Sequence, residues 1–105
     1  MKEHKIKNDV YDMNFTFIIA KSRTKIRKKH QIKWNGYGGT CHFHQQIYII
    51  IHPQAPLDVL VHECDHAISE LWKHCEIKKL RGPDESYSYM LGWLFKKCYK
   101  IWENK

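Results

Sequence analysis

Two histidines one helical turn apart, with a glutamate between them, are the residues of this chain best suited to metal chemistry. The run "HECDH" contains His62, Glu63 and His66. On a helix, positions four apart differ by about 40° around the axis and about 6 Å along it, so two imidazole nitrogens can reach one tetrahedral Zn²⁺. Glu63 points in a different direction and is placed to act on a water molecule as a base. The spacing therefore predicts one zinc ion per chain, although cobalt or nickel would also accept such ligands.

A zinc site that performs chemistry needs a third protein ligand and an open fourth position. Glu85 follows His66 after eighteen residues, enough for a helix to end, turn at "RGP" and return antiparallel. We expect Glu85 at the start of that second helix, with Gly92 letting the two helices approach closely. His74 lies about 12 Å beyond His66 along the same axis, too far to share the ion. The alternative role for Glu85 is a carboxylate favoured by the helix dipole.

The motif and the downstream glutamate resemble the gluzincin group of zinc metallopeptidases. "HECDH" and the Glu of "DESYSYMLGW" stand in that group's ligand order, and the length resembles minimal gluzincin-like proteins of prokaryotes and their phages. The resemblance covers about residues 46–95. It implies a zincin-like fold, one Zn²⁺ on His62, His66 and Glu85, and peptide hydrolysis with Glu63 as the base.

The chain departs from the larger gluzincins around these ligands. Those proteins often carry an aspartate one turn after the ligand glutamate, supporting a histidine, and here that position is Tyr89. They also supply a separate residue that steadies the oxyanion, and no motif identifies it here. Tyr87, Tyr89 and His44 are the first candidates for these roles, with His42 and His52 as further ones.

Strands followed by helices are the elements that must position these residues. "NFTFIIA" (14–20) predicts a strand, and alternation, the "NGYGG" turn and an isoleucine-rich arm predict a β-hairpin over 24–52. An amphipathic stretch from 57 to about 77 predicts the motif helix, and a second helix is expected from about 84 to 102. This order predicts an α+β fold, with a small antiparallel or mixed sheet followed by two helices.

Length and cysteine usage suggest one intracellular domain. The 105 residues suffice for a single domain over 1–105, preceded by a polar lead-in over 1–12. No export signal or membrane-spanning run is evident, which favours a cytoplasmic protein. The four cysteines include no C-x-x-C pair and are expected to be free thiols, with Cys64 and Cys75 in the core.

The formal net charge of +7 is concentrated in "KSRTKIRKKHQIK" (21–33), which carries seven Lys or Arg in thirteen residues. Such a segment can bind nucleic acid or an acidic partner, with Arg27, Lys28 and Lys29 as the contact residues. The alternative is a solvated strand edge, where lysines discourage pairing with other chains.

The preferred function is zinc-dependent hydrolysis of a peptide or protein substrate. Its backbone is expected to lie along an exposed strand edge, for which "HQQIYII" (44–50) is the candidate. Two alternatives stay open: the nucleic-acid or acidic-partner module, and a zinc-stabilised regulator that is inactive or latent. Glu63 argues against the regulator, because a structural zinc site does not need that carboxylate.

Overall fold

The chain adopts an α+β fold with a mixed sheet, as the order of its elements predicts. The computed structural model describes residues 2–7, 13–34, 36–43, 45–77 and 85–105. The described elements are β1 (Lys2–Ile6), β2 (Asn14–Ile19), α1 (Arg23–His30), β3 (Gly38–Phe43), β4 (Gln46–Ile51), α2 (Leu57–His74) and α3 (Glu85–Glu103).

The four strands pair in the order β1-β2-β4-β3, so β2 and β4 are central and β1 and β3 are edges. The central pair is parallel, with Asn14 opposite Gln46, whereas both outer pairs are antiparallel. A central strand buried on both faces needs apolar residues at successive positions rather than at alternate ones. This requirement explains the uninterrupted runs "FII" in β2 and "III" in β4.

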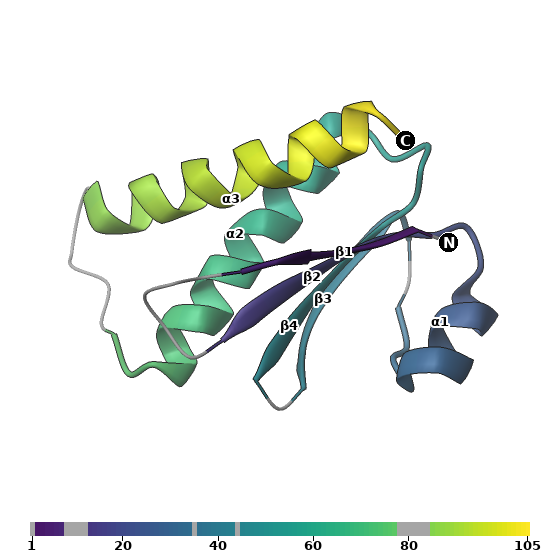
Figure 1. Cartoon of the computed structure of the whole chain (residues 1–105), viewed down its shortest axis with the longest axis horizontal. Coiled ribbons are helices and arrows are strands. Elements are labelled where there is room, and N and C mark those ends of the chain that lie inside the picture. Colours follow the sequence, from purple (N-terminus) through teal and green to yellow (C-terminus); the bar gives the residue numbers. More distant parts are fainter. Residues whose placement is uncertain (1, 8–12, 35, 44, 78–84) are drawn as a thin grey trace.

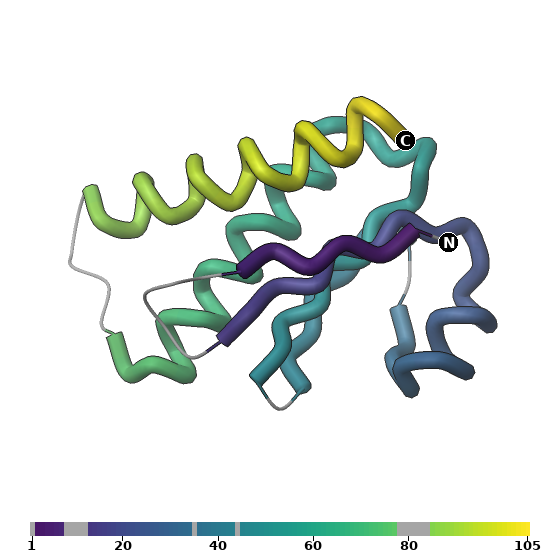
Figure 2. Tube along the Cα trace, viewed as in Figure 1, coloured from purple at the N-terminus to yellow at the C-terminus, as the bar shows by residue number. Residues whose placement is uncertain are grey.

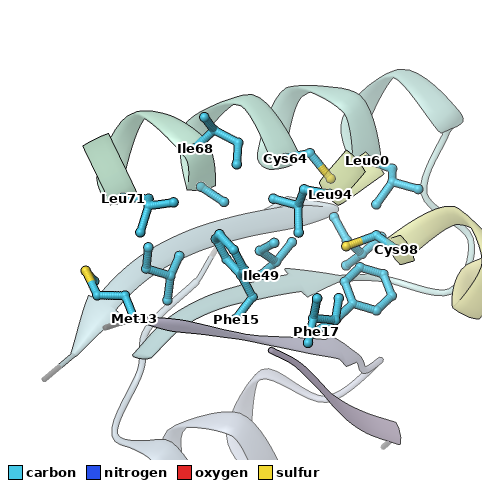
Figure 3. Packing of buried hydrophobic residues seen from close by; sticks show 14 of the residues in the cluster. Met13, Phe15, Phe17, Ile49, Leu60, Cys64, Ile68, Leu71, Leu94 and Cys98 are labelled. Atoms are coloured by element: carbon cyan, nitrogen blue, oxygen red, sulfur yellow. The ribbon is translucent and has the colours of Figure 1, made fainter. Parts of the chain in front are cut away.

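Helices cover both faces of the sheet, giving three layers with two hydrophobic cores (Figure 1 and Figure 2). The larger core lies between the sheet and the α2–α3 pair, and Figure 3 shows its side chains. From the sheet it takes Phe15, Phe17, Ile19, Ile47, Ile49 and Ile51, and from the helices Leu60, Cys64, Ile68, Leu71, Leu94 and Cys98. The smaller core packs Ile26 of α1 and the following Ile32 and Trp34 against Ile18 and Ile50.

The predicted hairpin over 24–52 is wrong in its first arm. Arg23–His30 is an α-helix, in which Ser22 Oγ accepts a hydrogen bond from Lys25 N–H and Gln31 ends the helix in the left-handed region. Only Ile26 of this helix is buried, and Ile32 and Trp34 are buried from the extended segment that follows. The alternation of apolar residues seen in the sequence therefore spans a helix and the segment after it, not a strand. The second arm is itself the hairpin, since β3 and β4 pair antiparallel.

The polar lead-in is also different from the prediction, because Lys2–Ile6 forms β1 and pairs with β2. Its side chains are mostly exposed, as an edge strand allows, and Ile6 alone is buried. The strand predicted at 14–20 and the two C-terminal helices are confirmed, each within a few residues of its expected ends. No helix in the described residues has both the length and the apolar composition that crossing a membrane requires.

Candidate metal centre

The burial pattern of α2 leaves the two motif histidines facing solvent. The helix directs Leu60, Cys64, Ala67, Ile68 and Leu71 into the larger core, and each of these is 0% exposed. At 100° per residue, His62 and His66 fall on the opposite side of the helix from that stripe. Both are exposed. Core packing of α2 thus fixes the helix rotation and, with it, the direction of the two imidazoles.

The two imidazoles converge on one point. The Nε2 atoms of His62 and His66 are 2.9 Å apart, and the rings are nearly perpendicular at 87°. Two nitrogens on one tetrahedral Zn²⁺, each about 2.0–2.1 Å from it, are separated by about 3.4 Å. The observed pair needs to open by only about half an ångström to satisfy that geometry. In the metal-free protein, the same nitrogens can share a single hydrogen bond if one is protonated and the other is not.

Glu63 lies beside the histidines in a different environment. Its carboxylate, together with the two imidazoles, completes a group of ligand atoms that all lie within 4.8 Å of one another. The residue is 6% exposed, and its buried Oε2 has no hydrogen-bond partner among the described residues. Burial raises the pKa of this carboxyl, although His66, His62 and a hydrogen bond from Thr40 act in the opposite direction. An unpaired oxygen on a carboxylate of raised pKa suits a group that must accept a proton.

The edge strand β3 lies against this part of α2. Gly38 approaches so closely that a Cβ placed on it would be 2.9 Å from Val59 Cγ1 and 3.1 Å from Glu63 Cγ. Two residues along, Thr40 Oγ1 donates a hydrogen bond of 3.1 Å to the backbone carbonyl of Glu63. A surface hollow of about 540 Å³ is bounded by His62, Glu63, Asp58, Val59 and the Gly36–Gly38 segment. The sequence placed Gly38 in the predicted turn and Thr40 in the second arm of the predicted hairpin, and it gave neither residue a role at the site.

The strand expected to offer its edge to a substrate is not at an edge. "IYIII" belongs to β4, which pairs with β2 on one side and β3 on the other. The free edge near the motif belongs to β3. His52 N–H donates to the Tyr37 carbonyl, and hydrogen-bonded and non-bonded positions alternate in an antiparallel pair. The main-chain groups of Gly38, Thr40 and His42 therefore point away from β4, toward that free edge.

Glu85 is not brought into the group of ligand atoms formed by the motif residues. It is exposed in the first turn of α3 and borders a shallow hollow with Ser88, Tyr89, Gly92, Trp93 and Lys96. Gly92 does not mediate helix contact, because a Cβ there would meet nothing within 4 Å. The close approach of α2 and α3 at Gly92 is therefore wrong, and zinc ligation by Glu85 stays a prediction.

The candidates for oxyanion or supporting roles have distinct positions. Tyr87 is buried on α3 and joins it to α2, because its hydroxyl bonds to Asp65 Oδ1 at 2.7 Å and Ser69 Oγ at 2.6 Å. Tyr89 is 76% exposed. His44 lies outside the described residues. No role is tested for any of the three.

The remaining candidate histidines have aromatic partners. His42 stacks on His74, with ring centroids 3.6 Å apart, near the far end of α2. His52 packs edge-on against Tyr37. Neither belongs to the group of ligand atoms around His62.

The basic segment forms the exposed surface of α1, in the layer across the sheet from α2 (Figure 1). Arg27, Lys28 and Lys29 are all exposed. Lys29 pairs with Glu3 of β1, and His30 Nε2 lies 2.7 Å from the other oxygen of the same carboxylate. The strand edge proposed for these lysines is wrong, since the segment from 23 to 30 is helical.

Comparison with protein-family models, curated proteins and solved structures finds no match for this chain.

Proposed function

We propose that the protein is a zinc-dependent metallopeptidase of gluzincin type. The observation that carries the proposal is the pairing of two convergent, solvent-facing Nε2 atoms with an adjacent buried carboxylate oxygen that has no hydrogen-bond partner in the described part of the chain. Two surface histidines alone would serve a structural metal site equally well. A buried carboxylate with one oxygen that has no hydrogen-bond partner among the described residues has a destabilising desolvation cost, which favours a catalytic role over a structural one.

Each residue has a separate task in this proposal. His62 and His66 hold the ion, and Glu85 is the proposed third ligand. When bound, Zn²⁺ supplies a Lewis acid that acidifies water and polarises a carbonyl group. Glu63 accepts the proton of the attacking water and transfers it to the leaving amine. The carbon–nitrogen bond of the peptide breaks, the hydroxyl adds to the carbonyl carbon, and no oxidant or reductant is needed.

The free edge of β3 is the proposed seat of the substrate backbone. Gly38 and Thr40 contact Glu63, so a peptide paired with this edge passes beside the carboxylate. Main-chain hydrogen bonds to an edge strand hold an extended peptide without regard to its side chains. Because Gly38 has no side chain, β3 can lie this close to Glu63. A shallow, strand-edge site of this kind favours unfolded or extended segments over folded domains.

Metal analysis paired with one isosteric variant tests the proposal. Native protein should contain one zinc per chain and cleave a mixed peptide library, and a chelator should stop the cleavage. Glu63→Gln should retain zinc while hydrolysis falls by about 10² or more, the scale of a lost general base. Full activity in Glu63→Gln, or activity that survives removal of all metal, would contradict the proposal. A zinc-loaded parent without activity on any peptide would favour the inactive regulator.

Binding of nucleic acid by α1 is the second candidate function. Five of the eight residues in "RTKIRKKH" are Lys or Arg, and the helix has no acidic residue in its first turn. Phosphate contacts would make the affinity fall steeply with salt concentration. Replacing Arg27 and Lys28 with glutamine should reduce that slope if the helix binds a backbone, and it should leave peptide hydrolysis within a few-fold of the parent.

A further inference from the structure

A second hollow adjoins the candidate metal centre and shares its wall. It has a volume of about 450 Å³ and is bounded by Lys21, Arg23, Trp34, His52 and the Gly36–Tyr37 segment. The same Gly36–Tyr37 segment also bounds the hollow that contains His62 and Glu63. The two hollows therefore border each other at Gly36–Tyr37, and together they give a surface with one end at the metal centre and the other at Arg23.

The two ends of this surface differ in charge. The end at the metal centre carries Asp58 and Glu63, whereas the far end carries Lys21 and Arg23 and no acidic residue among its bounding side chains. We call the far end the cationic hollow. Because the described residues give it no carboxylate of its own, the cations there are available to an external one.

The donors of the cationic hollow are held in place by the protein. The Arg23 guanidinium lies 5.9 Å from the centre of the Trp34 ring, and its Nη2 donates to the Gly36 carbonyl at 3.4 Å. These contacts use one face of the guanidinium plane and one of its N–H groups. The other N–H groups of Arg23 can donate a pair of hydrogen bonds to a carboxylate. Trp34 is almost fully buried, and its indole Nε1 has no hydrogen-bond partner in the described part of the chain.

Tyr37 separates the two ends. Its side chain is 52% exposed, although its ring packs edge-on against His52 with centroids 5.4 Å apart. An exposed aromatic side chain braced by a neighbour offers a flat apolar surface with little conformational entropy to lose. Because Tyr37 bounds both hollows, a substrate chain that passes from one hollow to the other lies against Tyr37.

We infer that the cationic hollow is a specificity subsite that binds a carboxylate of the peptide substrate. The carboxylate comes either from an Asp or Glu side chain or from the C-terminal α-carboxyl group. The inference rests on the proposed function, since it assigns the substrate class of the same site.

A peptide fits this surface better than a nucleic acid does. A strand of phosphates would carry negative charge along the whole surface, including the end where Asp58 and Glu63 lie. A peptide with one acidic residue places negative charge only at Arg23 and Lys21. Such local charge complementarity determines which peptide residue lies at Arg23 as well as how tightly the peptide binds.

Competing peptides test the inference. A panel would place Glu, Gln or Lys at each of three positions on either side of a cleaved bond, and a second pair would differ only in a free or amidated C-terminus. We expect kcat/KM to favour Glu over Gln by about three- to tenfold at one position, the scale of a partly exposed, charge-assisted ion pair. Preference for the free over the amidated C-terminus would instead identify the α-carboxyl group as the source.

Charge reversal at the subsite should invert the preference. Arg23→Glu should favour the Lys peptide. Lys21→Glu should do the same, and it is the second variant to use if Arg23→Glu does not fold. Lys97→Glu on α3 is the matched control, because it makes the same change outside both hollows and should leave the Glu/Gln ratio as in the parent. Equal cleavage of the Glu and Gln peptides by the active parent, together with equal cleavage of the free and amidated C-termini, would overturn the subsite and leave the proposed function intact.

Binding measured without turnover distinguishes failure of the carboxylate subsite from failure of the proposed peptidase function. In Glu63→Gln, fluorescence anisotropy of labelled peptides should show the same preference for the acidic peptide, and Arg23→Glu in that background should abolish it. Absence of hydrolysis in a zinc-loaded parent that still binds acidic peptides would overturn the proposed peptidase and keep the carboxylate site. Tighter binding of labelled single-stranded DNA or RNA than of acidic peptide, lost in Arg23→Glu, would overturn the peptide assignment.

Discussion

Gly38 of the edge strand and Glu63 of the motif helix are in such close contact that a methyl group on Gly38 would lie 3.1 Å from Glu63 Cγ. The same methyl group would lie 2.9 Å from Val59 Cγ1, on a short side chain with little freedom to move. Gly38→Ala should therefore push β3 and α2 apart and displace the carboxylate. We expect a lower melting temperature, and peptide hydrolysis should fall more than zinc content does. Parent-like values of both would mean that the contact is not tight.

Gly92→Ala provides the matched control for that substitution. Gly92 lies within α3, is exposed, and has nothing within 4 Å of an added Cβ. Alanine in a helix interior is favoured over glycine by about 0.5–1 kcal/mol. The melting temperature should therefore rise, in the opposite direction to Gly38→Ala. A fall would show that Gly92 has a packing role after all.

Glu85→Ala tests the third ligand. If Glu85 binds zinc, the variant should lose most of its zinc affinity and, since ligation is coupled to folding, the zinc-loaded protein should melt at a lower temperature. His62→Ala provides the scale for loss of a ligand. A competition titration with a chromophoric chelator measures both. Parent-like zinc affinity in Glu85→Ala would move the third ligand elsewhere, with His42, His44 and His52 next to test.

The thiols of Cys64 and Cys98 should be inert in the folded protein. Both side chains are 0% exposed, and a hydrogen bond with Cys64, together with burial, raises the pKa of Cys98. A thiol reacts as its thiolate, so both features slow modification. A double variant with serine at the half-buried Cys41 and Cys75 should show no thiol reaction until denaturant is added. A rapid reaction, or a disulfide joining α2 to α3, would contradict this.

The two C-terminal helices could be predicted because nothing competes with their periodicity. From Leu57 onward the chain has a helical apolar stripe and no Gly or Pro before the helix ends. The motif histidines share this rigid element, so spacing alone determined their convergence. Glu85 is different, because its position depends on how two helices are connected. Local spacing does not specify that relationship.

The sheet was harder to predict because its pattern is set by neighbours distant in sequence. "IYIII" has the continuous apolar character of a strand buried on both faces, which argues for a central position and against an exposed edge. β1 shows the opposite problem, since an edge strand with exposed side chains has the composition of a polar tail. Ile26 of α1 and Ile32 and Trp34 of the segment after it are all buried against one sheet face, and their even spacing resembled a strand.

The ion pair that ties β1 to α1 should make stability depend on acid pH. Burial acts to raise the pKa of Glu3, but hydrogen bonds and charge from Lys29 and His30 outweigh it, so the pKa lies below the ordinary glutamate value of 4.5. A carboxylate with a lowered folded pKa stabilises the protein above the unfolded pKa, and this contribution is lost as the pH falls through the folded value.

Glu3→Gln should lower the free energy of unfolding by about 0.5–1 kcal/mol at neutral pH. The difference between parent and variant should shrink as the pH falls below 4.5. Urea denaturation across that range measures it, and Lys28→Gln on the same helix should show no such convergence. A difference that stays constant from neutral to acid pH would mean that the charge of Glu3 does not stabilise the fold.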